Sequence, residues 1–138
     1  MPLDEPAHPT VLIVEDERIS RQAMAYLLEQ SGFRSAACES AEEALERLGD
    51  EPPPALALID VDLPGMSGLE LIARLEKLRP GLFAILITAA GGERIETFRK
   101  AHDVQYIRKP VDFRRLLELL DERRSSDKAG HHTVRSPN

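Results

Sequence analysis

The chain has 138 residues, a formal net charge of −6 and 42% hydrophobic residues. This length and composition predict one globular domain that folds without disulfides, and the single cysteine, Cys38, excludes an intramolecular one. The acidic balance argues against a broad nucleic-acid-binding surface, so we expect no direct DNA binding. No apolar stretch is long enough to cross a bilayer and the N-terminus has no signal-peptide pattern. We therefore expect a cytoplasmic protein without membrane contact.

Short apolar runs alternate with helical patterns along the whole chain. A run that is apolar at successive residues is typical of a strand covered on both faces. The predicted strands are residues 10–14, 34–38, 55–59, 83–87 and 104–107. Each is followed by a helical pattern, and this alternation predicts an α/β fold: a single doubly wound, five-stranded parallel sheet with five helices.

The helices are predicted from their start signals and from apolar residues at helical spacing. Capping residues are expected at Ser40 with Glu43, at Ser67 with Glu70, and at Asp112. The faces expected to point inward are Ile19, Ala23, Tyr26 and Leu27; Ala41, Ala44, Leu45 and Leu48; Leu71, Leu75 and Leu78; Ile95 and Phe98, in a short helix over 92–101; and Phe113, Leu116, Leu117 and Leu120.

The periodic pattern begins near residue 10 and stops near Arg124. The sequence therefore predicts an N-terminal extension over residues 1–9, a folded domain over 10–124 and a disordered tail over 125–138.

Polar residues follow four of the predicted strands. Glu15 and Asp16 come after the first strand, Asp60 after the third, Thr88 after the fourth and Lys109 after the fifth. Sites in open parallel sheets form beyond the carboxyl ends of the strands, so these side chains are expected to meet. Two carboxylates about 4 Å apart repel by roughly 4 kcal/mol at an effective dielectric constant near 20, so the cluster needs a cation. Oxygen ligands suit Mg²⁺, and a lysine and a hydroxyl suit a phosphoryl group.

Four sequence stretches together resemble the receiver domain of two-component response regulators, of the single-domain kind found in chemotaxis regulators. They are "VLIVEDE", "ALALIDVDLPGMSGLEL", "AILITA" and "YIRKPVD", and the resemblance covers roughly residues 10–122. It implies a flavodoxin-like fold with strand order 2-1-3-4-5. Taken singly, each residue has an ordinary structural explanation, and the combination at four strand ends favours a functional site.

The resemblance also implies roles for the acidic residues and the lysine. Asp60 corresponds to the phosphoacceptor. Asp16 and Glu15 correspond to the acids that bind Mg²⁺ together with Asp60, and Asp62 falls where the family supplies a backbone carbonyl to the metal. Lys109 corresponds to the lysine that contacts the phosphoryl group.

The remaining family positions concern switching. Thr88 resembles the switch hydroxyl, Tyr106 resembles the switch aromatic residue, and the Lys109–Pro110 bond is expected to be cis. The resemblance implies that a histidine kinase or a histidine phosphotransfer protein donates a phosphoryl group to Asp60. The face made by the fourth helix, fifth strand and fifth helix would then control a downstream protein. Such a domain is not an enzyme beyond catalysing its own phosphorylation and slow dephosphorylation, and dimerisation is left open.

Three features depart from the family pattern, and all lie near the expected signalling face. The segment from Thr88 to Lys109 is one residue shorter than expected, His102 replaces a usual glycine, and two glycines, Gly91 and Gly92, lie near the fourth helix. A residue with a side chain adopts positive φ at a helix end at a greater energetic cost than glycine.

Two other functions compete with the receiver interpretation. The stretch "LIDVDLPG" faintly resembles the Asp-x-Asp motif of haloacid-dehalogenase phosphatases. An interaction module with a receiver fold and no phosphorylation is the second alternative. Turnover of a phosphate monoester would distinguish the first alternative, and loss of Mg²⁺ binding on changing Asp16 would argue against the second.

Overall fold

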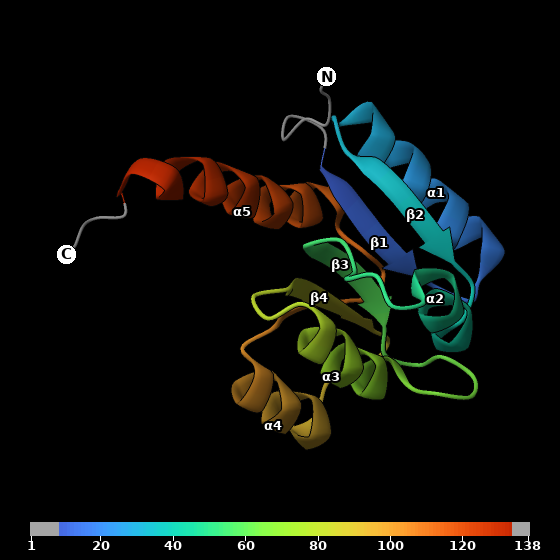
Figure 1. Cartoon of the computed structure of the whole chain (residues 1–138). Helices are drawn as coiled ribbons and strands as arrows, with labels where there is room; N and C mark the ends of the chain where they lie inside the picture. Colours follow the sequence, from blue (N-terminus) through green and yellow to red (C-terminus); the bar gives the residue numbers. More distant parts are fainter. Residues whose placement is uncertain (1–8, 134–138) are drawn as a thin grey trace.

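A five-stranded parallel sheet forms the centre of the molecule (Figure 1). The computed structural model describes residues 9–133. The strands are β1 (Thr10–Val14), β2 (Arg34–Cys38), β3 (Leu56–Asp60), β4 (Phe83–Thr88) and β5 (Gln105–Arg108). Their order is β2-β1-β3-β4-β5, so the predicted fold class and strand order are confirmed, and the predicted strand bounds agree to within one residue.

Helices cover both faces of the sheet. They are α1 (Arg18–Gln30), α2 (Ala41–Leu48), α3 (Gly68–Leu78), α4 (Glu93–His102) and α5 (Phe113–Thr133). Residues of α1 and α5 pack with one face of the sheet, and residues of α2, α3 and α4 pack with the other (Figure 1). Within the described part of the chain, no helix is both long and apolar enough to cross a membrane.

The central strand β3 is buried along its whole length, because helices cover both sides of it. Its side chains alternate between the two cores: Leu58 packs on the α1 and α5 side, and Ile59 packs on the α2, α3 and α4 side. Asp60 is the last residue of β3, and β3 pairs with β1 on one edge and with β4 on the other.

All three predicted capping residues accept a hydrogen bond at the start of a helix, and Asp112 Oδ1 accepts from the Arg115 amide at 3.2 Å. The Ser40 hydroxyl accepts a bond from the Glu43 amide at 2.9 Å, and the Glu43 carboxylate accepts one from the Glu39 amide at 2.7 Å. The Ser67 hydroxyl accepts a bond from the Glu70 amide at 3.2 Å. The first turns of α2 and α3 are therefore fixed by side chains.

The predicted inward face of α1 is wrong. Ile19 is 73% exposed, Tyr26 is 61% exposed, and the side chains that face the core are Met24 and Leu28. The helix is apolar on most of its circumference, so its spacing fits more than one face. The rotation seen buries Met24 and Leu28, and it is compatible with the Arg21 guanidinium group donating to backbone carbonyls of the β1–α1 loop.

The other predicted faces agree more closely with the structure. In α3, Leu71 and Leu75 are buried as expected, whereas Leu78 is 41% exposed and Ile72 is buried instead. In α5, the expected residues pack inward together with Leu119, which the prediction omitted.

The end of α4 differs from the expectation based on His102. The helix includes His102, and Asp103 takes the left-handed conformation, with φ 55° and ψ 49°. Aspartate tolerates this region better than most residues, because its short side chain can bond locally. The absence of glycine is thus accommodated one residue later, and the His102 imidazole lies 2.7 Å from Glu76 Oε1 on α3.

The helix α5 extends beyond the predicted end of the ordered domain. The sequence predicts disorder after Arg124, whereas the helical backbone continues to Thr133 and projects past the sheet (Figure 1). Continuing a helix adds one hydrogen bond for each residue fixed, so an apolar face is not required for a few further turns. Residues 1–8 of the predicted extension over 1–9, and residues 134–138 of the predicted tail over 125–138, lie outside the described residues.

Glycine is required at the first position of α3. A Cβ atom at Gly68 would overlap the carbonyl oxygen of Asp60 and lie 3.0 Å from Ile59 Cγ2. The Gly68 amide also donates to the Val61 carbonyl at 3.2 Å, which closes the loop after β3.

We predict that Gly68→Ala lowers the free energy of unfolding by about 1–3 kcal/mol, because the new methyl group forces the end of β3 to move. Urea unfolding would measure this loss. The matched control is Gly91→Ala, where a Cβ meets no atom within 4 Å and a change under about 0.5 kcal/mol is expected. Equal stability of the two variants would contradict the steric argument.

Candidate functional site

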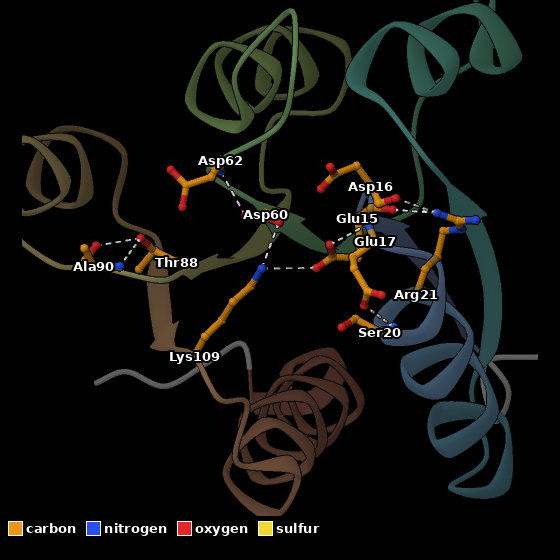
Figure 2. Close-up of polar contacts among 10 residues, drawn as sticks. All are labelled: Glu15, Asp16, Glu17, Ser20, Arg21, Asp60, Asp62, Thr88, Ala90 and Lys109. Atoms are coloured by element: carbon orange, nitrogen blue, oxygen red, sulfur yellow. Dashed lines mark hydrogen bonds and ion pairs between the residues drawn. The ribbon is translucent and has the colours of Figure 1, made fainter.

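Asp60 lies at the centre of the polar site and ends the most buried strand (Figure 2). Its carboxylate is almost fully buried and makes two contacts. Asp60 Oδ1 accepts a hydrogen bond from the Asp62 amide at 2.9 Å, and Asp60 Oδ2 accepts one from Lys109 Nζ at 3.1 Å. The first contact comes from the loop after β3 and the second from the residue after β5, so two separate segments fix one carboxylate.

Two further acids come from the end of β1. Oxygens of Glu15, Asp16 and Asp60 all lie within 4.8 Å of one another. Glu15 is 1% exposed, its Oε1 makes no hydrogen bond, and Lys109 Nζ lies 3.6 Å from that atom. The structure therefore brings together the three carboxylates and the lysine that the sequence analysis selected (Figure 2).

Burial and the neighbouring charges change the pKa of two groups in this cluster, Glu15 and Lys109. Burial raises the pKa of Glu15, the hydrogen bond from the Glu17 amide opposes this shift, and the charge of Asp60 adds to it. Burial alone would lower the pKa of Lys109, but its hydrogen bond to Asp60 and the charges of Asp60 and Glu15 raise it above its ordinary value. The single ammonium group of Lys109 thus forms ion pairs with two buried carboxylates, those of Glu15 and Asp60.

The donor set fits a hard divalent cation. It contains only carboxylate oxygens, and one of them, Glu15 Oε1, is buried without a hydrogen-bond partner. Mg²⁺ prefers such ligands and usually keeps several waters. The residues that could hold it are Glu15, Asp16 and Asp60.

The loop between β1 and α1 is held by its own side chains. Glu15 Oε2 accepts from the Glu17 amide at 2.9 Å, and Glu17 Oε1 accepts from the Ser20 amide at 2.8 Å. Arg21 Nη1 donates to the carbonyls of Glu15 at 3.0 Å and Asp16 at 3.3 Å. Sequence reasoning missed Arg21, because an arginine on a surface helix carries no pattern that distinguishes it from a solvated one.

The position of Lys109 depends on β4 and on the turn that follows it. The Lys109 amide donates to the Thr88 carbonyl at 2.8 Å, which extends the pairing of β4 and β5. The Lys109–Pro110 peptide bond is cis, as expected.

The two residues expected to switch, Thr88 and Tyr106, are not among the hydrogen-bond or ion-pair partners of Asp60. The Thr88 hydroxyl donates to the Ala90 carbonyl at 2.6 Å and accepts from the Ala90 amide at 3.2 Å, within its own loop (Figure 2). Tyr106 is half-buried beside α4, and the Arg99 guanidinium carbon lies 5.7 Å from the centre of its ring. Both residues therefore lie on the side of the sheet that α4 covers.

Comparison with known proteins identifies the family. The model of the response regulator receiver domain matches residues 11–121, so the chain belongs to this family and to two-component signalling. This membership sets aside the phosphatase interpretation of the "LIDVDLPG" stretch.

Similar proteins include longer regulators and isolated receiver domains. A cyclic di-GMP phosphodiesterase of Thermotoga maritima is 39% identical over 80% of this chain and 28% of its own length. The phosphate regulon regulator PhoB of Escherichia coli is 35% identical over 80% of this chain and 49% of its own. The chain thus spans half or less of these relatives.

Solved structures agree with the fold, and the aligned regions cover nearly all of each solved chain. A CheY-like receiver domain from Methanospirillum hungatei is 32% identical, with a TM-score of 0.79 over 88% of this chain and 98% of that one. The response regulator TrrA of Thermotoga maritima, solved in complex with Mg²⁺-BeF, is 29% identical, with a TM-score of 0.72 over 83% of this chain and 97% of that one.

The raised pKa of Glu15 leads to a stability prediction. In EDTA at pH 7, Glu15→Gln should raise the melting temperature by about 1–4 °C, because a neutral amide removes the burial of a charge. The raised pKa of Glu15 also predicts a pH effect. The metal-free wild type becomes more stable as pH falls from 7 towards the range in which Glu15 is protonated, and the variant does not show this increase in stability.

Thermal unfolding between pH 5.5 and 7.5, with EDTA or with Mg²⁺, would measure both effects. Mg²⁺ should stabilise the wild type more than Glu15→Gln, since the variant loses one anionic ligand. A lower melting temperature for the variant in EDTA at pH 7 would contradict the assigned direction of the shift.

Proposed function

We propose that the chain is a phosphorylation-dependent switch in which Asp60 accepts a phosphoryl group from a phosphohistidine. The observation that carries this proposal is the environment of the Asp60 carboxylate. It is buried, it is 3.1 Å from Lys109 Nζ, and it belongs to a three-carboxylate group that fits a divalent cation. Such an arrangement suits a nucleophilic carboxylate that must be positioned before a phosphoryl group arrives.

The proposed reaction transfers one phosphoryl group and changes no oxidation state. A carboxylate oxygen of Asp60 forms a bond to phosphorus while the phosphorus–nitrogen bond of the donor breaks, and the electron pair of that bond stays on the imidazole nitrogen. Lys109 stabilises negative charge on the phosphoryl oxygens, and the Asp62 amide keeps Asp60 oriented. Water later releases phosphate and restores the carboxylate.

Mg²⁺ is the proposed cofactor. Glu15, Asp16 and Asp60 would hold it, with the Asp62 carbonyl as an additional ligand. When bound, Mg²⁺ neutralises charge between the carboxylates and the phosphoryl oxygens. The TrrA relative, solved in complex with Mg²⁺-BeF, supports this assignment.

Phosphorylation is proposed to act on α4, β5 and α5 through Thr88 and Tyr106. The Thr88 hydroxyl now bonds within its loop, so a phosphorylated Asp60 would compete with the Ala90 carbonyl for this donor. A change at Thr88 alters the space beside Tyr106, since both side chains lie on the face covered by α4. A downstream protein that binds this face would thereby distinguish two states of the domain.

The phosphohistidine donor is proposed to be a protein, either a histidine kinase or a histidine phosphotransfer protein in the cytoplasm. Two exposed apolar side chains on α1, Ile19 and Tyr26, support a protein contact next to the site. Ala23, between them on the helix, lines a pocket of about 230 Å³ that reaches Glu15 and Lys109. A helix of the donor that covered this apolar surface would hold its phosphohistidine close to Asp60.

The first test is the mass of the intact protein after incubation with acetyl phosphate or phosphoramidate, with and without Mg²⁺. We expect one Mg²⁺-dependent phosphoryl adduct on the wild type. Asp60→Asn should show none, because the amide is a poor nucleophile. An adduct that persists in Asp60→Asn would reject Asp60 as the acceptor. Absence of both an adduct and a beryllofluoride-induced shift in the wild type would favour a binding module without phosphorylation.

A second test separates the donor surface from the chemistry. Ile19→Glu should slow transfer from a phosphorylated donor protein by at least about tenfold, since it places a charge in an apolar contact. The same variant should react with acetyl phosphate at the wild-type rate. Equal slowing with both donors would indicate that the substitution damages the site itself, and no slowing with the donor protein would exclude the α1 surface.

A further inference from the structure

Glu42, on the first turn of α2, contacts the loop that follows the proposed phosphoacceptor. Its Oε2 atom accepts a hydrogen bond from the Met66 amide at 2.9 Å, across 24 residues of sequence. A Cβ atom built on Gly65 would lie 2.6 Å from the same oxygen, so the carboxylate is packed directly against the glycine backbone. Gly65 has φ +76°, which other residues rarely adopt. The loop is therefore shaped to receive this carboxylate.

The contact belongs to an ionised carboxylate. The hydrogen bond from the Met66 amide is the main cause that lowers the pKa of Glu42 below its ordinary value. Glu42 remains exposed to solvent, so the effect on overall stability is small. Its effect is instead expected to be local, on the conformation of the loop.

The first turn of α2, which carries Glu42, is fixed by packing and by a helix cap. Ala41 and Ala44, on either side of it, are buried against the core, and the Ser40 hydroxyl caps the helix. At the other side of the contact, the loop leads back to Asp62, whose amide donates to Asp60 Oδ1 at 2.9 Å. A fixed helix turn and the acidic site are thus connected through Met66, Gly65 and Asp62.

We propose that Glu42 is a positioning residue for Mg²⁺ binding: it holds the β3–α3 loop so that the Asp62 backbone carbonyl is preorganised as a ligand. The proposal rests on the proposed function, because it assumes that the three carboxylates bind Mg²⁺. Without the bond to Met66, the loop must be ordered when the ion binds, and the lost conformational entropy weakens binding. Glu42 is not one of the three grouped carboxylates and its hydrogen bond is with the Met66 amide, so it should alter the Mg²⁺ requirement and leave the maximal rate unchanged.

Three variants separate the hydrogen bond from the charge. Glu42→Ala removes both, Glu42→Gln keeps an oxygen that can accept from the Met66 amide, and Glu46→Ala removes a carboxylate from the exposed side of the same helix. Isothermal titration with Mg²⁺ alone would measure affinity. We expect Glu42→Ala to weaken binding about three- to tenfold, in line with the net loss of one hydrogen bond, and the other two variants to stay within about twofold of the wild type.

Two further measurements distinguish the positioning role of Glu42 from a role in overall stability. Amide hydrogen exchange at Met66 in the metal-free protein should be faster in Glu42→Ala only, with urea unfolding unchanged. Phosphorylation by acetyl phosphate should need more Mg²⁺ for half-maximal rate in this variant, with the rate at saturating Mg²⁺ within about twofold of the wild type.

The outcomes are separable. Wild-type affinity in Glu42→Ala would overturn the positioning role, and so would equal weakening in Glu42→Gln or Glu46→Ala, which would indicate an effect of charge. If the wild type itself fails to bind Mg²⁺, the proposed function fails with it. If the wild type binds Mg²⁺ and Glu42→Ala binds it equally well, this inference fails and the proposed function stands.

Discussion

The structure depends on the burial of two carboxylates, Glu15 and Asp60, beside a single ammonium group at the carboxyl edge of the sheet. Lys109 Nζ lies 3.1 Å from one and 3.6 Å from the other, so one cation faces two anions. Such a cluster is costly without further positive charge, because buried ions lose their hydration. The raised pKa of Glu15 expresses this cost, and the same imbalance makes the site receptive to a divalent cation.

Backbone and side-chain contacts around the cluster keep it in place. The cluster is assembled from residues that follow β1, β3 and β5, and each loop is tied separately: Arg21 holds the first, Glu42 the second, and the pairing of Lys109 with β4 the third. Because these side chains are held by contacts within the protein, little ordering would be needed for a divalent cation to bind. The α4 side of the site differs, since the Thr88 hydroxyl bonds only within its own loop.

The sequence predicted the fold well because its signals are local and mutually consistent. Continuous apolar runs such as "ALALI" require cover on both faces, and their alternation with helical patterns indicates a parallel sheet with two helical layers. The faces of α2 and α5 were predicted from apolar residues at helical spacing. The face of α1 was not, since apolar residues are spread around that helix and the packing of Met24 and Leu28 against the sheet is decided by the tertiary structure. The length of α5 was underestimated, because helix continuation needs no apolar pattern.

For the candidate site, the sequence by itself determined the chemical types and their order: acids after the first and third strands, a hydroxyl after the fourth and a lysine after the fifth. Parallel strands present their carboxyl ends at one edge, so the meeting of these groups followed from the fold class. Only the tertiary structure decided that Glu15 is buried with one oxygen unpaired, that Thr88 turns away from Asp60, and that Glu42 reaches Met66. Each of these depends on distances between segments remote in sequence, for which no local pattern carries information.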